Sequence, residues 1–279
     1  MSPGDVSALI IATREGIEMT LIAGIVLAYL TQVGARRAHR WVWAGVTAAA
    51  AVSLAFLGVL NALNAEFEGP TEKIFEGVTM LLAAGFLTWM ILWMLRQARY
   101  LKTELQQAVN LALAHGAAAW GIFFLVFFSV VREGVETALL LFAAPGAGKL
   151  LGAIVGLAIA VGIGVAIYAF GRRVDLRRFF TVTGIVLVLF AAGLVTHGVH
   201  EFVEAGVLAG GPQLFDAYEL LPDDVGIGSI LNSLLGYSAD PTLLEGVVYL
   251  GYYVVALILW RSGLIGRFTA ARPTVKPAE

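Results

Sequence analysis

The chain has no cysteine and few charged residues. Without cysteine it can form no disulfide and offers no thiolate ligand or thiol redox chemistry, so we expect any bound metal to be held by oxygen or nitrogen. Only 14% of its 279 residues are charged, and the mean hydropathy is +0.85. These values are far from those of soluble proteins and indicate a membrane protein. Lys and Arg are absent before Arg14, which argues against a cleavable signal peptide.

Apolar runs long enough to cross roughly 30 Å of hydrocarbon recur along the chain. They predict an all-α membrane protein with seven transmembrane helices, at 6–30, 42–63, 74–95, 118–143, 150–171, 179–203 and 243–260. We interpret the less apolar stretch 99–117 as an amphipathic lead-in to the fourth span. Residues 1–265 are predicted to form a single polytopic domain, in which the Gly/Pro/Asp-rich segment 204–242 is an external loop. Residues 266–279 then form a cytoplasmic tail.

Most basic residues fall in alternate connections between these spans. They are Arg36, Arg37 and Arg40; Arg96, Arg99 and Lys102; Arg172, Arg173, Arg177 and Arg178; and Arg261, Arg267, Arg272 and Lys276. By the positive-inside rule these connections are cytoplasmic, which places the N-terminus outside and the C-terminus inside. Of the 20 acidic residues, only Glu104, Asp175 and Glu279 then fall on the cytoplasmic side. We interpret the acidic outer face as a surface that attracts cations.

Two sequence echoes indicate an internal repeat. Arg14-Glu15-Gly16-Ile17-Glu18 in the first span matches Arg132-Glu133-Gly134-Val135-Glu136 in the fourth, and residues 81–88 in the third span resemble residues 189–196 in the sixth. The order is the same, so repeat one (6–95) and repeat two (118–203) each contain three spans. Because three is odd, the second repeat is inverted in the bilayer, and 243–260 is an extra helix.

The repeated motif predicts a cation site. Its two glutamates are three residues apart, so both carboxylates lie on one face of a helix, and its arginine is four residues from the second glutamate. Ionised side chains cannot face lipid without a large free-energy cost, so they must face one another, water or a cation. We expect the two copies to supply four carboxylates to one site for a hard cation. Buried ion pairs that only lock the two helices together are the structural alternative.

Further acids and histidines fall on the predicted outer side. His197, His200, Glu201 and Glu204 have the three- and four-residue spacings of metal ligands. Other acids lie at the starts of two spans and in a loop. Together with these acids, we expect the four residues to form an access route or a secondary metal site. The complete set is Glu66, Glu68, Glu72, Glu76, His197, His200, Glu201, Glu204 and Glu245. An acidic vestibule of this kind suits the capture of a dilute cation.

With its doubled motif in the first and fourth of seven spans, the chain resembles the oxidase-dependent iron transporter family, the high-affinity iron permeases, and in particular its bacterial members. The resemblance covers essentially residues 1–265. It implies import of iron across the inner or plasma membrane, with Glu15, Glu18, Glu133 and Glu136 as iron ligands and Arg14 and Arg132 as their partners. It also implies a periplasmic iron-binding or oxidase/peroxidase partner.

The predicted function is therefore an iron permease, not an enzyme, whose substrate is an iron ion. The carboxylates and the absence of cysteine favour ferric iron, the harder ion. We expect the lipid bilayer as surroundings, no organic cofactor and no nucleic-acid partner. Two alternatives stay open: a transporter of another hard cation such as manganese or magnesium, and an intramembrane metalloenzyme using His197, His200 and Glu201.

Overall fold

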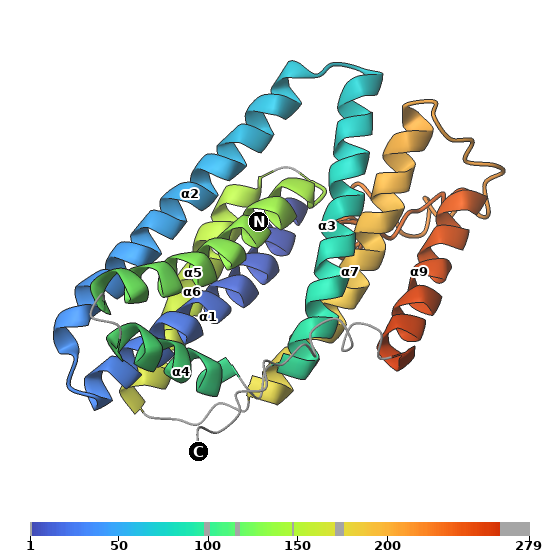
Figure 1. Cartoon of the computed structure of the whole chain (residues 1–279). Helices are drawn as coiled ribbons and strands as arrows, with labels where there is room; N and C mark the ends of the chain where they lie inside the picture. The colour runs from blue at the N-terminus through green and yellow to red at the C-terminus, as the bar shows by residue number, and fades with distance from the viewer. Residues whose placement is uncertain (1, 98–100, 115–117, 147, 171–175, 263–279) are drawn as a thin grey trace.

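The computed structural model describes residues 2–97, 101–114, 118–146, 148–170 and 176–262, and these residues form an all-α protein (Figure 1). The elements are α1 (Pro3–Gln32), the 3-10 helix η1 (Arg36–Ala38), α2 (His39–Glu66), α3 (Pro70–Gln97), α4 (Leu101–Ala114), α5 (Ala118–Ala143), α6 (Lys149–Phe170), α7 (Leu176–Glu204), α8 (Gly226–Leu235) and α9 (Leu243–Ser262). The predicted tail at 266–279 lies outside the described residues.

Five of these helices, α2, α3, α6, α7 and α9, are long and apolar enough to cross a membrane. The helices α1 and α5 have 30 and 26 residues and are also long enough, but they contain the charged motifs. All seven predicted spans fall on helices, with ends that differ by a few residues. That α1 and α5 also cross the membrane remains a prediction.

Two segments contain more helix than the sequence predicted. The expected lead-in at 99–117 includes a separate helix, α4, whose Leu105 and Val109 are buried against apolar residues of α1 and α5. The segment 204–242, expected to be an external loop, includes the ten-residue helix α8. This short apolar helix packs on α7 and α1, and the hydroxyl of Ser7 donates to the carbonyl of Ser233 at 3.3 Å. Burial against two helices outweighs the loop-like composition around it.

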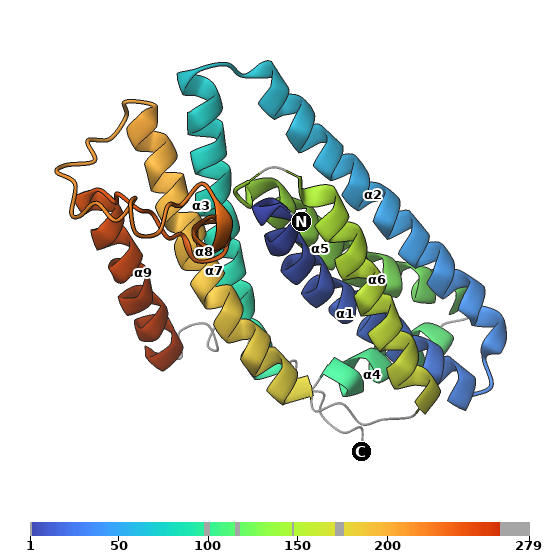
Figure 2. The ribbon, with the colours of Figure 1, turned by 180° about the vertical axis from the view of Figure 1, so that it is seen from behind.

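The long helices associate in pairs. The most extensive contacts join α1 to α6, α2 to α5, and α3 to α7. Figures 1 and 2 show α1, α2, α5 and α6 together on one side of the molecule, with α3, α7 and α9 on the other. Glycines allow the close approaches expected from the spacing of Gly152 and Gly156. A Cβ on Gly156 would lie 2.7 Å from the carbonyl oxygen of Leu9 in α1.

The beginning of α1 is fixed to the beginning of α6. Ser2 caps α1 in a capping box with Asp5, and Pro3 occupies the first turn, where its missing N–H costs nothing. Asp5 also accepts a hydrogen bond from the backbone N–H of Gly152 at 3.0 Å. This contact fixes the height of the motif in α1 relative to α6.

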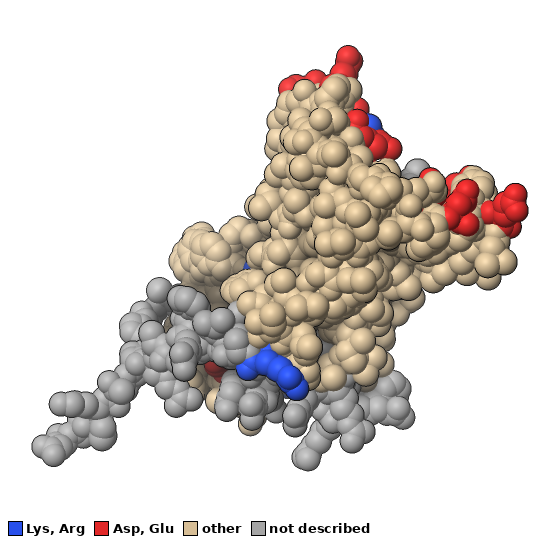
Figure 3. All heavy atoms as spheres, turned by 90° about the vertical axis from the view of Figure 1, so that its right-hand side faces the viewer, with Lys and Arg blue, Asp and Glu red and all other residues tan. Residues whose placement is uncertain are grey.

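Charge is distributed unevenly on the described surface. On the face drawn in Figure 3, acidic side chains gather at one end of the molecule. The exposed acids at the α2–α3 connection and in the segment after α7 include Glu66, Glu68, Asp216 and Glu219. Arg261 lies in the last turn of α9, the helix that follows this segment. This uneven charge is the one expected for an outer face that attracts cations.

Candidate metal site

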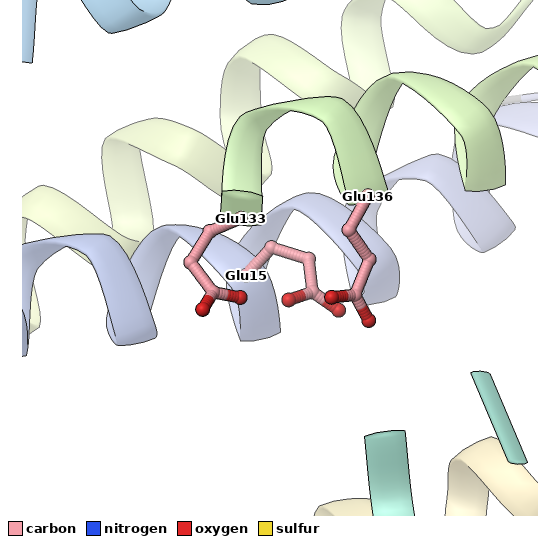
Figure 4. A group of neighbouring side chains, drawn as sticks. All are labelled: Glu15, Glu133 and Glu136. Carbon is pink, nitrogen blue, oxygen red and sulfur yellow. The ribbon is translucent and has the colours of Figure 1, made fainter. Parts of the chain in front are cut away.

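The two motifs meet where α1 contacts α5. Carboxylate oxygens of Glu15, Glu133 and Glu136 all lie within 4.8 Å of one another, a separation that a single metal ion can bridge. In Figure 4 the Glu15 side chain lies between those of Glu133 and Glu136. All three residues are buried, with exposed fractions of at most 1%. The two motifs, in the first and fourth predicted spans, therefore lie against each other in the structure.

The fourth motif carboxylate lies beside this cluster. Glu18 is also buried, but its Oε1 forms an ion pair with the guanidinium of Arg14 at 2.7 Å. The structure thus brings together three of the four predicted ligands and holds the fourth on the preceding arginine.

The two motif arginines differ in their surroundings. Arg14 is buried and contacts carboxylates of both helices: it pairs with Glu15 and Glu18, and its Nη1 lies 3.7 Å from Glu136. Arg132 pairs with Glu133, and its side chain is 40% exposed. Its guanidinium lies 4.8 Å from the centre of the Trp93 ring in α3. The predicted ion pair between Arg132 and Glu136 does not form between these two described residues, because Arg132 turns toward Trp93.

The four carboxylates have more acceptor oxygens than the surrounding protein has hydrogen-bond donors to offer them. Within the described part of the chain, no hydrogen bond reaches six of their oxygens: one on Glu15, one on Glu133, both on Glu136, and both on Glu18, whose Oε1 contacts Arg14 only as an ion pair. Buried polar atoms normally have partners, and leaving them without one costs free energy. Four carboxylates also exceed two guanidinium groups in charge. This arrangement is suited to a bound cation or to protons.

Both motif glycines lie at tight helix contacts. A Cβ on Gly16 would lie 2.7 Å from that of Ala160 in α6, and one on Gly134 would lie 2.8 Å from that of Ser53 in α2. The glycines therefore let α6 and α2 approach the backs of the motif helices. These contacts turn the glutamates of each motif toward the other motif.

A cavity of about 500 Å³ lies beyond the cluster, toward the α5–α6 connection. Its polar lining comes from α2, α3, α6 and α7: Asn61, Asn64, Glu76, Lys149, His197 and Glu201. Phe142, which also lines it, is six residues from Glu136 on α5, about 9 Å along the helix. Leu140 lies between them, fully buried in an apolar cluster with Ile11 and Leu87. This apolar cluster separates the cavity from the carboxylates.

The predicted access residues divide into three groups. Glu76, His197 and Glu201 line the cavity. His200, Glu204 and Glu245 form a network beside it, in which the His200 ring lies 2.7 Å from Glu245 and 3.1 Å from Glu204. Glu66, Glu68 and Glu72 lie outside the cavity lining, at the end of α2, in the α2–α3 connection and in the first turn of α3.

Several residues at these sites were missed by sequence reasoning. Lys73 pairs with both Glu201 and Glu204 and so neutralises part of the predicted acidic vestibule. Met90 and Met94 of α3 place their sulfur atoms 3.2 Å from Nη2 of Arg14. Their four-residue spacing puts them on one face of α3, but in the sequence alone this spacing is equally typical of a helix core.

Comparison with known proteins identifies one family and several named relatives. The model of the iron permease FTR1 family matches residues 5–267. The chain is 35% identical to the ferrous iron permease EfeU of Escherichia coli O6:H1 (strain CFT073) over 258 residues, which cover 89% of this chain and 92% of the relative. It is equally similar to the EfeU proteins of Yersinia pestis (90% and 91% covered) and Shigella sonnei strain Ss046 (94% and 98%).

No solved structure matches the chain. The family match spans almost its whole length, and the named relatives are permeases with nearly complete coverage. Together with several apolar helices long enough to cross a membrane, this identifies a multi-pass membrane protein that transports iron. The chain belongs to the iron permease FTR1 family.

Proposed function

We propose that this protein imports iron across the inner membrane through one site shared by its two Arg-Glu-Gly-x-Glu motifs. Glu15, Glu133 and Glu136 bind the ion in the arrangement described, and Glu18 joins them when Arg14 moves. The observation that carries the proposal is the convergence of three buried carboxylates from two helices, with most of their oxygens lacking a hydrogen-bond donor. Carboxylate oxygens are suitable ligands for iron, and iron that enters displaces any protons bound there.

The transported ion in this proposal is ferrous iron. The hardness of the carboxylate ligands favours ferric iron, as expected from the sequence, whereas the relatives carry the name ferrous iron permease. A divalent ion also matches the charge of the site, because four ionised glutamates and two arginines leave two negative charges. A periplasmic iron-binding partner would deliver ferrous iron to the acidic outer face, whereas the oxidase or peroxidase partner that the family resemblance implied would instead suit the delivery of ferric iron.

The topology in this proposal has seven spans, an external N-terminus and two inverted repeats. The exchange of helix partners supports it: if α1, α2 and α3 correspond to α5, α6 and α7, the α1–α6 pair corresponds to the α5–α2 pair. The motif glycines agree, since Gly16 meets α6 and Gly134 meets α2. Such repeats commonly place the transport site at their interface.

The same helix pairs suggest which parts move. Rocking one repeat against the other would break the extensive α1–α6 and α2–α5 contacts. Movement of the α3–α7 pair against the group of α1, α2, α5 and α6 preserves all three helix pairs. We therefore propose that this second movement opens the apolar cluster between the cavity and the carboxylates.

The metalloenzyme alternative has no support in the geometry. His197 lies 3.1 Å from the carbonyl of Asn232, His200 contacts Glu204 and Glu245, and Glu201 pairs with Lys73. These three residues do not form a metal-binding group among the described residues, where the glutamate cluster alone has that geometry.

Uptake by proteoliposomes tests the proposal. Radiolabelled Fe²⁺ is supplied anaerobically to vesicles containing the wild type or the Gln variant of Glu15, Glu18, Glu133 or Glu136. We expect uptake to fall about tenfold or more for Glu15, Glu133 and Glu136. Glu219→Gln, an exposed change of the same kind, is the matched control. Undiminished uptake in all four variants would refute the assignment, and preferential competition by Mn²⁺ or Mg²⁺ would favour transport of another cation.

A further inference from the structure

The guanidinium of Arg14 occupies a position built for a cation. Glu15 and Glu18 pair with it from α1, and Glu136 lies 3.7 Å from Nη1 on α5. On the remaining side, Nη2 lies 3.2 Å from the sulfur of Met90 and 3.2 Å from the sulfur of Met94. Three carboxylates and two thioethers thus surround one positive group.

The two methionines do more than fill space. Both are buried, at 2% and 6% exposure, and both belong to the apolar cluster that also contains Leu140 and Leu87. Four residues apart on α3, they direct their sulfur atoms to the same nitrogen. A thioether is a weak hydrogen-bond acceptor, so two of them are poor partners for a buried guanidinium. They are much better ligands for a soft or borderline metal ion.

We infer that Met90 and Met94 are iron ligands and that they determine the preference of the transport site for Fe²⁺ over harder cations. When Arg14 swings away, an ion at the position of its guanidinium meets carboxylate oxygens from α1 and α5 and thioether sulfur from α3. Ferrous iron is softer than ferric iron, Mg²⁺ or Mn²⁺, so sulfur ligands favour it. This inference rests on the proposed function and names the residues that select its substrate.

The position of the methionines also connects ion binding to movement. They lie on α3, whereas the carboxylates lie on α1 and α5, so the two kinds of ligand come from the two groups of helices proposed to move against each other. The mixed set of ligands is complete only while α3 lies against α1. Separation of the groups removes the sulfur ligands and lowers the affinity for Fe²⁺ at release.

X-ray absorption at the iron edge tests this inference. The full chain is purified, loaded anaerobically with Fe²⁺, and compared with Met90→Leu/Met94→Leu, which preserves side-chain volume. We expect sulfur directly bound to iron in the wild type, its loss in the double variant and its retention in Met19→Leu, a control on α1 that packs in another apolar cluster. The double variant is also expected to lose its preference for Fe²⁺ over Mn²⁺ by about tenfold in uptake competition.

The outcomes separate the inference from the function on which it rests. Iron bound by oxygen alone in the wild type, with carboxylate-dependent uptake intact, overturns the methionine assignment and leaves the permease. Uptake with unchanged selectivity in the double variant does the same. A wild type that neither binds nor transports iron overturns both. If the double variant unfolds, the wild-type spectrum decides alone, because it requires no substitution.

Discussion

Arg14 on α1 lies 3.7 Å from Glu136 on α5 and pairs with both glutamates of its own motif. It is therefore the cation that joins the two motifs in this structure. The corresponding Arg132 pairs with its neighbour Glu133 and is partly exposed. Two residues that are equivalent in the repeated sequence thus differ in burial and in ion-pair partners in the folded protein.

This difference predicts unequal effects of the same substitution. Arg14→Gln leaves buried carboxylates without their counter-charge and should destabilise the protein by about 3–5 kcal/mol. Arg132→Gln should cost about 1 kcal/mol or less, because its side chain is 40% exposed and the ion pair is screened. Thermal unfolding of both variants in the same detergent measures the difference. Equal destabilisation would contradict the central position assigned to Arg14.

Helix contact at the second motif predicts a loss of stability in Gly134→Ala. The added methyl group would lie 2.8 Å from Cβ of Ser53, so α2 and α5 must separate or distort, at a cost of about 1–3 kcal/mol. Gly24→Ala is the matched control, since nothing lies within 4 Å of its Cβ position on α1. Thermal unfolding should separate the two. A Gly134→Ala protein as stable as Gly24→Ala would show that the contact is looser than described.

Lys73 predicts a change in uptake that depends on salt. Lys73→Gln removes the cation that pairs with Glu201 and Glu204, so the surface around these residues becomes more negative. We expect the KM for iron to fall about twofold at low ionic strength and the difference to shrink at high salt. Arg261→Gln, which removes a positive charge from the last turn of α9, should leave the KM unchanged. The same shift in both variants would indicate a nonspecific effect of net charge.

Much of the fold could be predicted from the sequence, because long apolar runs between basic connections define helices with little ambiguity. The motifs could be recognised because charged residues inside apolar helices are costly and so have a function. By contrast, α8 was missed because its ten residues lie in a Gly/Pro/Asp-rich segment and are stabilised by contacts with α1 and α7. The apolar residues of α8 do recur at helical spacing, but a run of ten residues is too short to predict a helix within such a segment.

The candidate site could be predicted in composition but not in geometry. Spacing on one helix predicts that Glu15 and Glu18 share a face, yet it cannot reveal that Arg14 holds Glu18 while Glu15 faces Glu133. The absence of cysteine directed the sequence-based expectation to oxygen and nitrogen ligands, so the methionines that we infer to be ligands were not among the candidates. Met90 and Met94 look like ordinary core residues until α3 is placed against α1.

The central claim is that the two motifs form one iron site. Anaerobic equilibrium binding of Fe²⁺ to the purified protein tests it most directly, with Glu15→Gln and Glu136→Gln compared with the wild type and with Glu219→Gln. A shared site predicts one iron ion per chain in the wild type and in the control, and loss of that ion when either motif is changed. If each motif variant instead retained half of the iron bound by the wild type, the motifs would be two independent sites and the account would be wrong.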